Sequence, residues 1–99
     1  MKVKVLTNRS GKMEINHEPG KFSVREAGGE AVLLYRQDGD TIDLYHTFTP
    51  EKLRGKGIAA KLTQAAFEYA KENDLTVVPT CPYEQKFLKD HEEWKSVVK

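Results

Sequence analysis

The pattern of apolar and polar positions changes along the chain from a period of two to a period near 3.6. Apolar and β-branched residues alternate or run together in three segments, which predict strands at 22–25, 31–36 and 41–47. Asp38-Gly39, between the second and third segments, is a strong signal for a tight hairpin turn. These strands predict an antiparallel meander, and shorter strands are expected before it, near 1–6 and 13–16.

The second half of the chain begins with helical spacing. A helix from Ile58 to about Glu72 would carry on one face Ile58, Leu62, Ala65, Ala66 and Tyr69. Asn73 suits a left-handed residue after this helix. The apolar run 75–78 predicts a strand that a right-handed crossover places parallel to the 41–47 strand. With a short closing helix at 83–90, the pattern predicts an α+β fold with a mixed, mostly antiparallel sheet.

One stretch, Arg54-Gly55-Lys56-Gly57-Ile58-Ala59, lies where the third strand of the meander gives way to the long helix. Glycine permits a left-handed backbone and leaves the amides accessible, and the first N–H groups of a helix lack partners within it. Flanking cations add positive charge, so we interpret the loop as an anion site, most naturally for a phosphate. The alternative is a tight turn with solvated cations. The spacing fits neither the P-loop nor the dinucleotide fingerprint, because Ala60 occupies the third glycine position.

Composition narrows the possible functions. Ninety-nine residues suit one domain over 1–99, and no apolar run approaches the length of a membrane span. The first residues are too few and too polar for a signal peptide. A net charge of +1 argues against a nucleic-acid surface.

One cysteine cannot form an intrachain disulfide, which favours the cytoplasm. Cys81 and the three histidines lack metal-ligand spacing, and we expect no metal and read His17 as a surface turn residue.

His46 and Cys81 are the candidate reactive residues. His46 lies near the carboxyl end of the strand before the helix, and Cys81 lies just past the strand after it. Parallel neighbouring strands would bring both to the sheet edge beside the loop, where α/β proteins commonly bind ligands. Taken singly, each has a structural explanation: alternation places His46 on the face of Ile42 and Leu44, and a lone cysteine is usually a small buried residue. Their shared position favours a catalytic pair.

The loop resembles the acetyl-CoA-binding motif of the GNAT superfamily of N-acetyltransferases, Arg/Gln-x-x-Gly-x-Gly/Ala, with Arg54, Gly57 and Ala59 at its fixed positions. More of the chain resembles the minimal, single-domain YjdJ-like branch. Its pattern, a strand ending in His-Thr-x-x-Pro followed by the glycine loop and Pro-x-Cys, matches His46 to Pro50, Arg54 to Ala59 and Pro79 to Cys81.

This resemblance implies a GNAT-like fold in which acetyl-CoA lies between two splayed parallel strands. Its diphosphate would bind the amides of Gly55, Lys56, Gly57, Ile58 and Ala59, with added charge from Arg54 and Lys56. The pantetheine arm would follow the strand near Thr47 and Phe48. The branch's active residues fall on His46, the expected general base, and Cys81, the expected proton donor or transient acyl carrier. This branch lacks the helices that build the acceptor site in the larger GNAT enzymes. The resemblance therefore does not identify the amine acceptor, which we expect to be a small molecule or a protein.

The leading hypothesis is therefore an acetyl-CoA-dependent N-acetyltransferase, acting as a monomer or weak homodimer. A second hypothesis is a CoA-binding module without turnover, which would be indifferent to changes at His46. A third is a thiol-dependent hydrolase that uses Cys81 and His46 and needs no CoA.

Overall fold

The computed structural model describes residues 4–7, 14–26 and 29–98. Six strands form one sheet whose spatial order follows the sequence. They are β1 (Lys4–Thr7), β2 (Glu14–Glu18), β3 (Lys21–Glu26), β4 (Gly29–Asp38), β5 (Thr41–Phe48) and β6 (Thr76–Val78). Neighbours pair antiparallel, except that β6 pairs parallel with β5. The structure confirms the predicted meander and the predicted parallel crossover.

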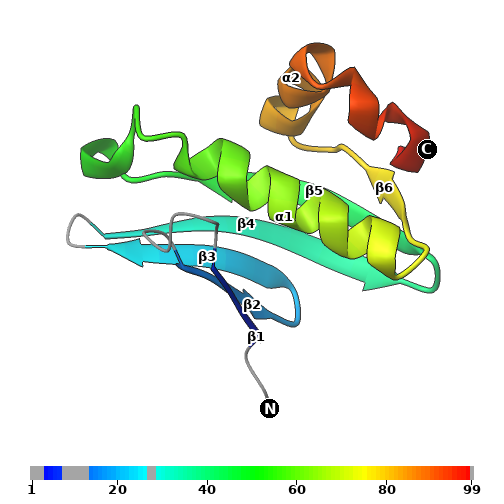
Figure 1. Cartoon of the computed structure of the whole chain (residues 1–99), viewed down its shortest axis with the longest axis horizontal. Coiled ribbons are helices and arrows are strands. Elements are labelled where there is room, and N and C mark those ends of the chain that lie inside the picture. Colours follow the sequence, from blue (N-terminus) through cyan, green and yellow to red (C-terminus); the bar gives the residue numbers. More distant parts are fainter. Residues whose placement is uncertain (1–3, 8–13, 27–28, 99) are drawn as a thin grey trace.

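The helical segments are η1 (Glu51–Leu53), α1 (Ile58–Glu72), α2 (Pro82–Asp90) and η2 (Glu92–Val97), where η marks a 3-10 helix. Figure 1 shows α1 lying along the sheet, with α2 and η2 beside it toward the β6 side. Contacts of α1 with β3, β4, β5 and β6 show that it covers one face of the sheet. Among the described residues, no helix is long and apolar enough to cross a membrane.

The first and last residues of α1 agree with the prediction from periodicity, but the conformation of the residue after the helix does not. The helix runs from Ile58 to Glu72 as predicted. Asn73 was predicted to be left-handed, and this is wrong: its φ is −109°, while Asp74 takes the left-handed conformation with φ 55°. The Asn73 side-chain amide instead donates a hydrogen bond of 2.8 Å to the Tyr69 carbonyl. Asn73 therefore satisfies a carbonyl of the last turn, and the chain reverses one residue later.

The core lies between α1 and the sheet. The predicted apolar face of α1 is buried, apart from the partly buried Tyr69. Phe67 was not assigned to that face, yet it is fully buried, because the C-terminal segments pack against a second side of the helix. Its ring meets those of Phe87 and Trp94 edge to face, each at 5.7 Å between centroids. This packing holds α2 close to the middle of α1.

The strand β5 continues beyond the end of β6. The parallel ladder ends at Asp43 and Val78, and one further hydrogen bond of 2.9 Å runs from the Cys81 N–H to the Leu44 carbonyl. After that bond the chain turns away into α2, while β5 continues to Phe48. The two parallel strands therefore open into a wedge, bounded by β5 from Tyr45 to Phe48 on one side and by the first turn of α2 on the other. The resemblance placed acetyl-CoA in a wedge of this kind.

Candidate functional site

The glycine loop has the backbone that its sequence predicts. Gly55 and Gly57 have φ of +82° and +75°, in the left-handed region that L-residues rarely adopt. A Cβ atom built on either glycine would meet nothing within 4 Å. These glycines are therefore required by the backbone conformation and not by a close neighbour, and the space in front of the loop is open.

The amino terminus of α1 has no cap from a side chain. Gly57 is the N-cap residue, and the first helical hydrogen bond runs from the Lys61 N–H to the Gly57 carbonyl at 3.1 Å. The N–H groups of Ile58, Ala59 and Ala60 precede that bond, and the first turn contains no acidic residue. Unpartnered amides at the positive end of a helix dipole form an anion-binding site.

Two cations flank these amides. Arg54 is exposed, and its Nε donates a hydrogen bond of 3.1 Å to the Thr49 carbonyl, which orients the guanidinium beside the loop. The Lys56 Nζ lies 3.7 Å from Glu26 Oε1 in a pair that is half exposed on the lysine side. An exposed ion pair of this kind contributes little free energy. Lys56 can therefore exchange Glu26 for a bound anion at small cost.

A pocket of about 220 Å³ lies over the loop. The loop and the first turn of α1 form one wall, and Thr49, Leu53 and Tyr83 complete it. Burial raises the pKa of the Tyr83 phenol, with a smaller contribution from the neighbouring Glu84 carboxyl. Tyr83 therefore presents a neutral hydroxyl at the α2 side of the pocket.

A β-bulge in β5 decides which way His46 faces. Tyr35 pairs with Leu44 and Leu34 pairs with His46, so Tyr45 is an extra residue on β5. Tyr35 and Leu44 are buried on the α1 side, and His46 therefore lies with Leu34 on the opposite face, where it is exposed. The expectation that His46 shares a face with Ile42 and Leu44 is wrong, because strict alternation cannot anticipate an inserted residue.

Cys81 is placed on the other side of the wedge. It is 8% exposed, it is the N-cap residue of α2, and its N–H makes the last backbone hydrogen bond to β5. The preceding Thr80 donates its hydroxyl proton to the Asp43 carboxylate, and its N–H bonds to the Val78 carbonyl at 3.0 Å. The fold brings His46 and Cys81 to the same stretch of β5, with the His46 side chain exposed and the Cys81 side chain buried.

Thr47 and Phe48 form the β5 edge of the wedge. Thr47 pairs with Leu33 on the buried side, and its hydroxyl donates a hydrogen bond of 2.8 Å to Glu84 Oε2. Phe48 is 48% exposed, the one large exposed apolar side chain in the described part of the chain. These positions provide a free strand edge with an apolar surface, suitable for an extended, largely apolar arm.

Glu84 is a buried acid that the sequence analysis did not single out. It is fully buried, and Oε2 accepts hydrogen bonds from Thr47 of β5 and from Thr63 of α1, the latter at 3.2 Å. Oε1 is buried and has no hydrogen-bond partner among the described residues. Burial raises the pKa of this carboxyl, and the two threonine hydroxyls oppose the rise. Its spacing with Phe87 and Leu88, the other buried residues of α2, was the available signal.

This raised pKa predicts how stability depends on pH. In the unfolded chain the Glu84 carboxyl ionises near its usual value of 4.5, whereas in the fold it keeps its proton to higher pH. The stability it contributes is fully present below the unfolded pKa and is lost as pH rises through the folded pKa. Urea unfolding should therefore show wild type losing stability relative to Glu84→Gln with rising pH. A difference that stays constant from pH 4 to pH 8 would contradict the assignment.

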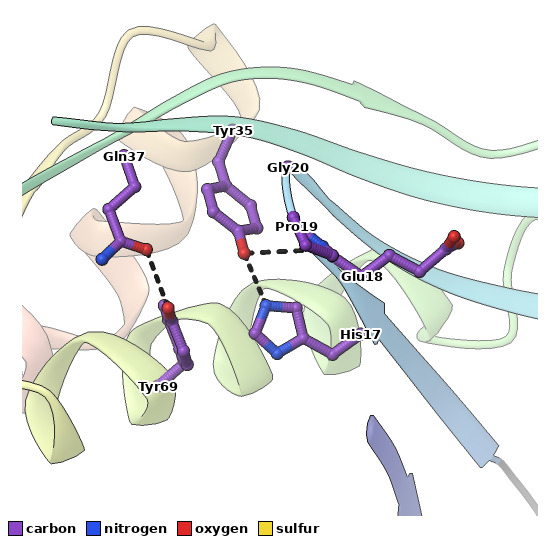
Figure 2. Close-up of a pocket in the computed structure, with 7 residues that line it drawn as sticks. All are labelled: His17, Glu18, Pro19, Gly20, Tyr35, Gln37 and Tyr69. Atoms are coloured by element: carbon purple, nitrogen blue, oxygen red, sulfur yellow. Dashed lines mark hydrogen bonds between the residues drawn. The ribbon is translucent and has the colours of Figure 1, made fainter. Parts of the chain in front are cut away.

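A second, larger pocket of about 390 Å³ lies near the other end of α1 (Figure 2). The Tyr69 hydroxyl donates to Gln37 Oε1 at 2.7 Å, and the Tyr35 hydroxyl donates to the Glu18 carbonyl at 3.4 Å. His17 lies here in β2, stacked on Phe22 at 4.0 Å, so its interpretation as a surface turn residue is wrong. None of the predicted site residues lines this pocket. Its hydroxyl groups are bonded to the walls, and we place the candidate site at the loop.

The described residues contain no group of three or more His, Cys, Asp or Glu side chains arranged to hold a metal ion.

Comparison with known proteins identifies relatives across most of the chain. The NATD1 proteins of Xenopus tropicalis and Homo sapiens are 42% and 41% identical to it over 83 residues. Each alignment covers 81% of this chain, with 76% of the frog protein and 74% of the human protein.

A solved structure and a family model agree with this likeness. The solution structure of a GCN5-like protein from Staphylococcus aureus matches with a TM-score of 0.71 and 27% identity, and covers 86% of both chains. The GNAT-like fold predicted from the loop is therefore confirmed. A family model described as GCN5-related N-acetyl-transferase matches residues 21–97. The chain belongs to the GCN5-related N-acetyltransferase family.

Proposed function

We propose that this protein transfers an acetyl group from acetyl-CoA to an amine. The observation that carries the proposal is the uncapped amino terminus of α1, which opens onto a pocket beside the β5–α2 wedge. Anion-binding amides and a strand edge next to each other suit a ligand in which a diphosphate is joined to a long neutral arm. CoA has this composition.

The residues around the loop fit that ligand. The amides of Gly55, Lys56, Gly57, Ile58 and Ala59 would hold the diphosphate, with Arg54 and the Lys56 ammonium beside it. The open space over both glycines leaves room for phosphate oxygens. The free edge of β5 at Thr47 and Phe48 would bind the arm and offer N–H groups to the thioester carbonyl, as an oxyanion hole does. When bound, the cofactor supplies an acetyl group activated as a thioester.

The exposure of His46 and the burial of Cys81 suit two separate proton transfers. His46, exposed on the open face, accepts the proton that the amine loses as it attacks the carbonyl carbon. Cys81, which is buried, gives its proton to the sulfur as the carbon–sulfur bond breaks. In this arrangement the amine approaches His46 from the open face. Cys81 as a transient acyl carrier is the alternative, in which its sulfur itself takes the acetyl group.

Replacement of Cys81 by alanine separates the two roles. If Cys81 gives a proton to the sulfur, acetyl transfer should persist at a rate lowered by about 10²–10⁴-fold, because water replaces a positioned acid. The assay is release of free CoA thiol with a panel of primary amines. Mass spectrometry of wild type after incubation with acetyl-CoA provides the second measurement: a mass gain of one acetyl group on Cys81, lost on addition of amine, would favour the covalent route.

A CoA-binding module without turnover is the second candidate, because the open glycine loop and the uncapped start of α1 would hold CoA whether or not His46 and Cys81 react. It predicts CoA binding with no acetylation of any amine tested. We further propose a cytoplasmic location, since the single cysteine suits a reducing compartment, and a monomer or weak homodimer. The acceptor is a small amine or a protein amine, and the open face of the sheet suits either.

A further inference from the structure

The one fully buried acid among the described residues lies in the first turn of α2, which forms one side of the wedge. Glu84 is 0% exposed although it belongs to a helix whose other polar residues are mostly exposed. A carboxyl group removed from water costs free energy unless its oxygens are bonded, and here one oxygen has no partner among the described residues. A methionine or leucine would fill the same space without this cost. The position therefore calls for an explanation beyond packing.

The hydrogen bonds of Glu84 connect three elements that border the site. Oε2 accepts from Thr47, at the edge of β5 beyond the bulge, and from Thr63, one turn into α1 from the anion loop. Glu84 itself lies in the first turn of α2, where its N–H bonds to the Cys81 carbonyl at 3.0 Å. One carboxyl oxygen thus links the strand edge, the helix that begins at the loop and the turn that carries the cysteine.

We propose that Glu84 is a positioning residue, which holds the Thr47 edge of β5 and the Cys81 turn at the separation that receives the thioester end of CoA. The wedge has no ladder hydrogen bonds beyond Leu44, so its opening is set by side chains. The hydrogen bond of 2.8 Å from the Thr47 hydroxyl to Oε2 crosses this opening. The identity of the ligand in this inference rests on the proposed function. The expected effect of Glu84 on the accessibility of Cys81 does not.

The upward shift in the pKa of Glu84 agrees with this role, which is carried by the hydrogen bonds from Thr47 and Thr63. The groups that face it are the Thr47 hydroxyl from β5, the Thr63 hydroxyl from α1 and the Tyr83 phenol from its own helix, and none of these carries a positive charge. Burial keeps the carboxyl protonated to higher pH than usual. A neutral acid can accept both threonine hydroxyls without placing a charge in the core. A glutamine reproduces this neutral acceptor, which provides the conservative variant.

The test compares four variants with wild type in two measurements. Glu84→Ala removes the link, which is the pair of hydrogen bonds from Thr47 and Thr63 to Glu84 Oε2. Thr63→Val removes one of these hydrogen bonds with little change in side-chain volume, and Glu84→Gln retains the acceptor. Leu88→Ala is the control, because Leu88 is buried in the same helix and takes no part in the link. The measurements are CoA affinity by isothermal titration and the rate at which iodoacetamide alkylates Cys81, the only thiol in the sequence. Circular dichroism checks that each variant is folded.

We expect Glu84→Ala and Thr63→Val each to weaken CoA affinity and to speed alkylation by roughly tenfold, the usual size of coupling between contacting groups. Glu84→Gln and Leu88→Ala should stay within about twofold of wild type in both. If Glu84→Ala does not fold, Thr63→Val decides alone. The inference is overturned if Leu88→Ala matches the link variants, or if the link variants behave as wild type. Failure of wild type to bind CoA would refute the proposed function, and the alkylation rates would then decide the inference.

Discussion

Replacing Gly57 with tryptophan is expected to lower CoA affinity by at least about a hundredfold, because the indole would occupy the space in front of the loop and separate the phosphate from two or more amides. Each hydrogen bond to a charged group contributes about 1.5–3 kcal/mol, and 1.4 kcal/mol is a tenfold change in affinity. Isothermal titration of CoA into wild type and variant measures the difference directly.

The chain offers a matched control at another turn. Gly39 also has a left-handed backbone, with φ +60°, and a Cβ there would meet nothing within 4 Å. Gly39→Trp therefore imposes the same bulk and a similar backbone cost, about 1–2 kcal/mol, at the hairpin between β4 and β5. CoA affinity should be unchanged in this variant. Equal losses at both glycines would mean that binding falls through instability, and the diphosphate assignment would be wrong.

Replacing His46 with alanine is expected to lower the rate of acetyl transfer by about 10²–10⁴-fold while leaving CoA affinity within about twofold of wild type. The physical reason is the bulge at Tyr45, which places His46 on the open face with Leu34, away from the pocket over the loop. A residue that acts only on the amine should alter turnover and not cofactor binding. Steady-state rates and titration calorimetry on the same preparations measure the two effects.

His91→Ala is the control for this experiment. The His91 ring stacks on Phe87 at 3.9 Å, and its Nδ1 lies 2.9 Å from the Phe87 carbonyl, so its loss should affect the packing of α2 and leave the proton transfer intact. If His46→Ala transfers acetyl groups at the wild-type rate, His46 is not the base. If wild type itself releases no CoA thiol with any amine, the chain is a CoA-binding module.

The backbone of the glycine loop and the architecture around it were predictable from the sequence because local signals agreed there. The switch from strand to helical period, the glycines between them and the apolar run 75–78 each restrict the backbone within a few residues. The structure accordingly contains the meander, a helix beginning at Ile58 and the parallel β6. Each of these features depends on neighbours in the chain, and sequence patterns report such features well.

The features that the sequence did not predict depend on long-range packing. The bulge at Tyr45 places His46 on the face opposite to the one that alternation predicts. No local signal in 41–47 indicates an extra residue. Phe67 is buried because Phe87 and Trp94 pack on it from the C-terminal segments. The contacts that bury Phe67 come from residues twenty or more positions away, and the bulge depends on how β5 pairs with β4.

Glu84 is an instructive intermediate case. A glutamate in the first turn of a helix is ordinarily a surface residue that favours the positive end of the dipole. Its spacing with Phe87 and Leu88 placed it on the apolar face, which was visible in the sequence. The acceptor role was not visible, because it requires Thr47 and Thr63 to meet at one oxygen from two other elements.

A titration of isotope-labelled wild type with CoA, followed by amide ¹H–¹⁵N spectra, tests the central claim most directly. Main-chain N–H groups bound to a diphosphate change their chemical shifts strongly, so the account predicts that the largest changes fall on Gly55, Lys56, Gly57, Ile58 and Ala59. Changes concentrated instead around Tyr35 and Tyr69, in the pocket of Figure 2, would contradict it.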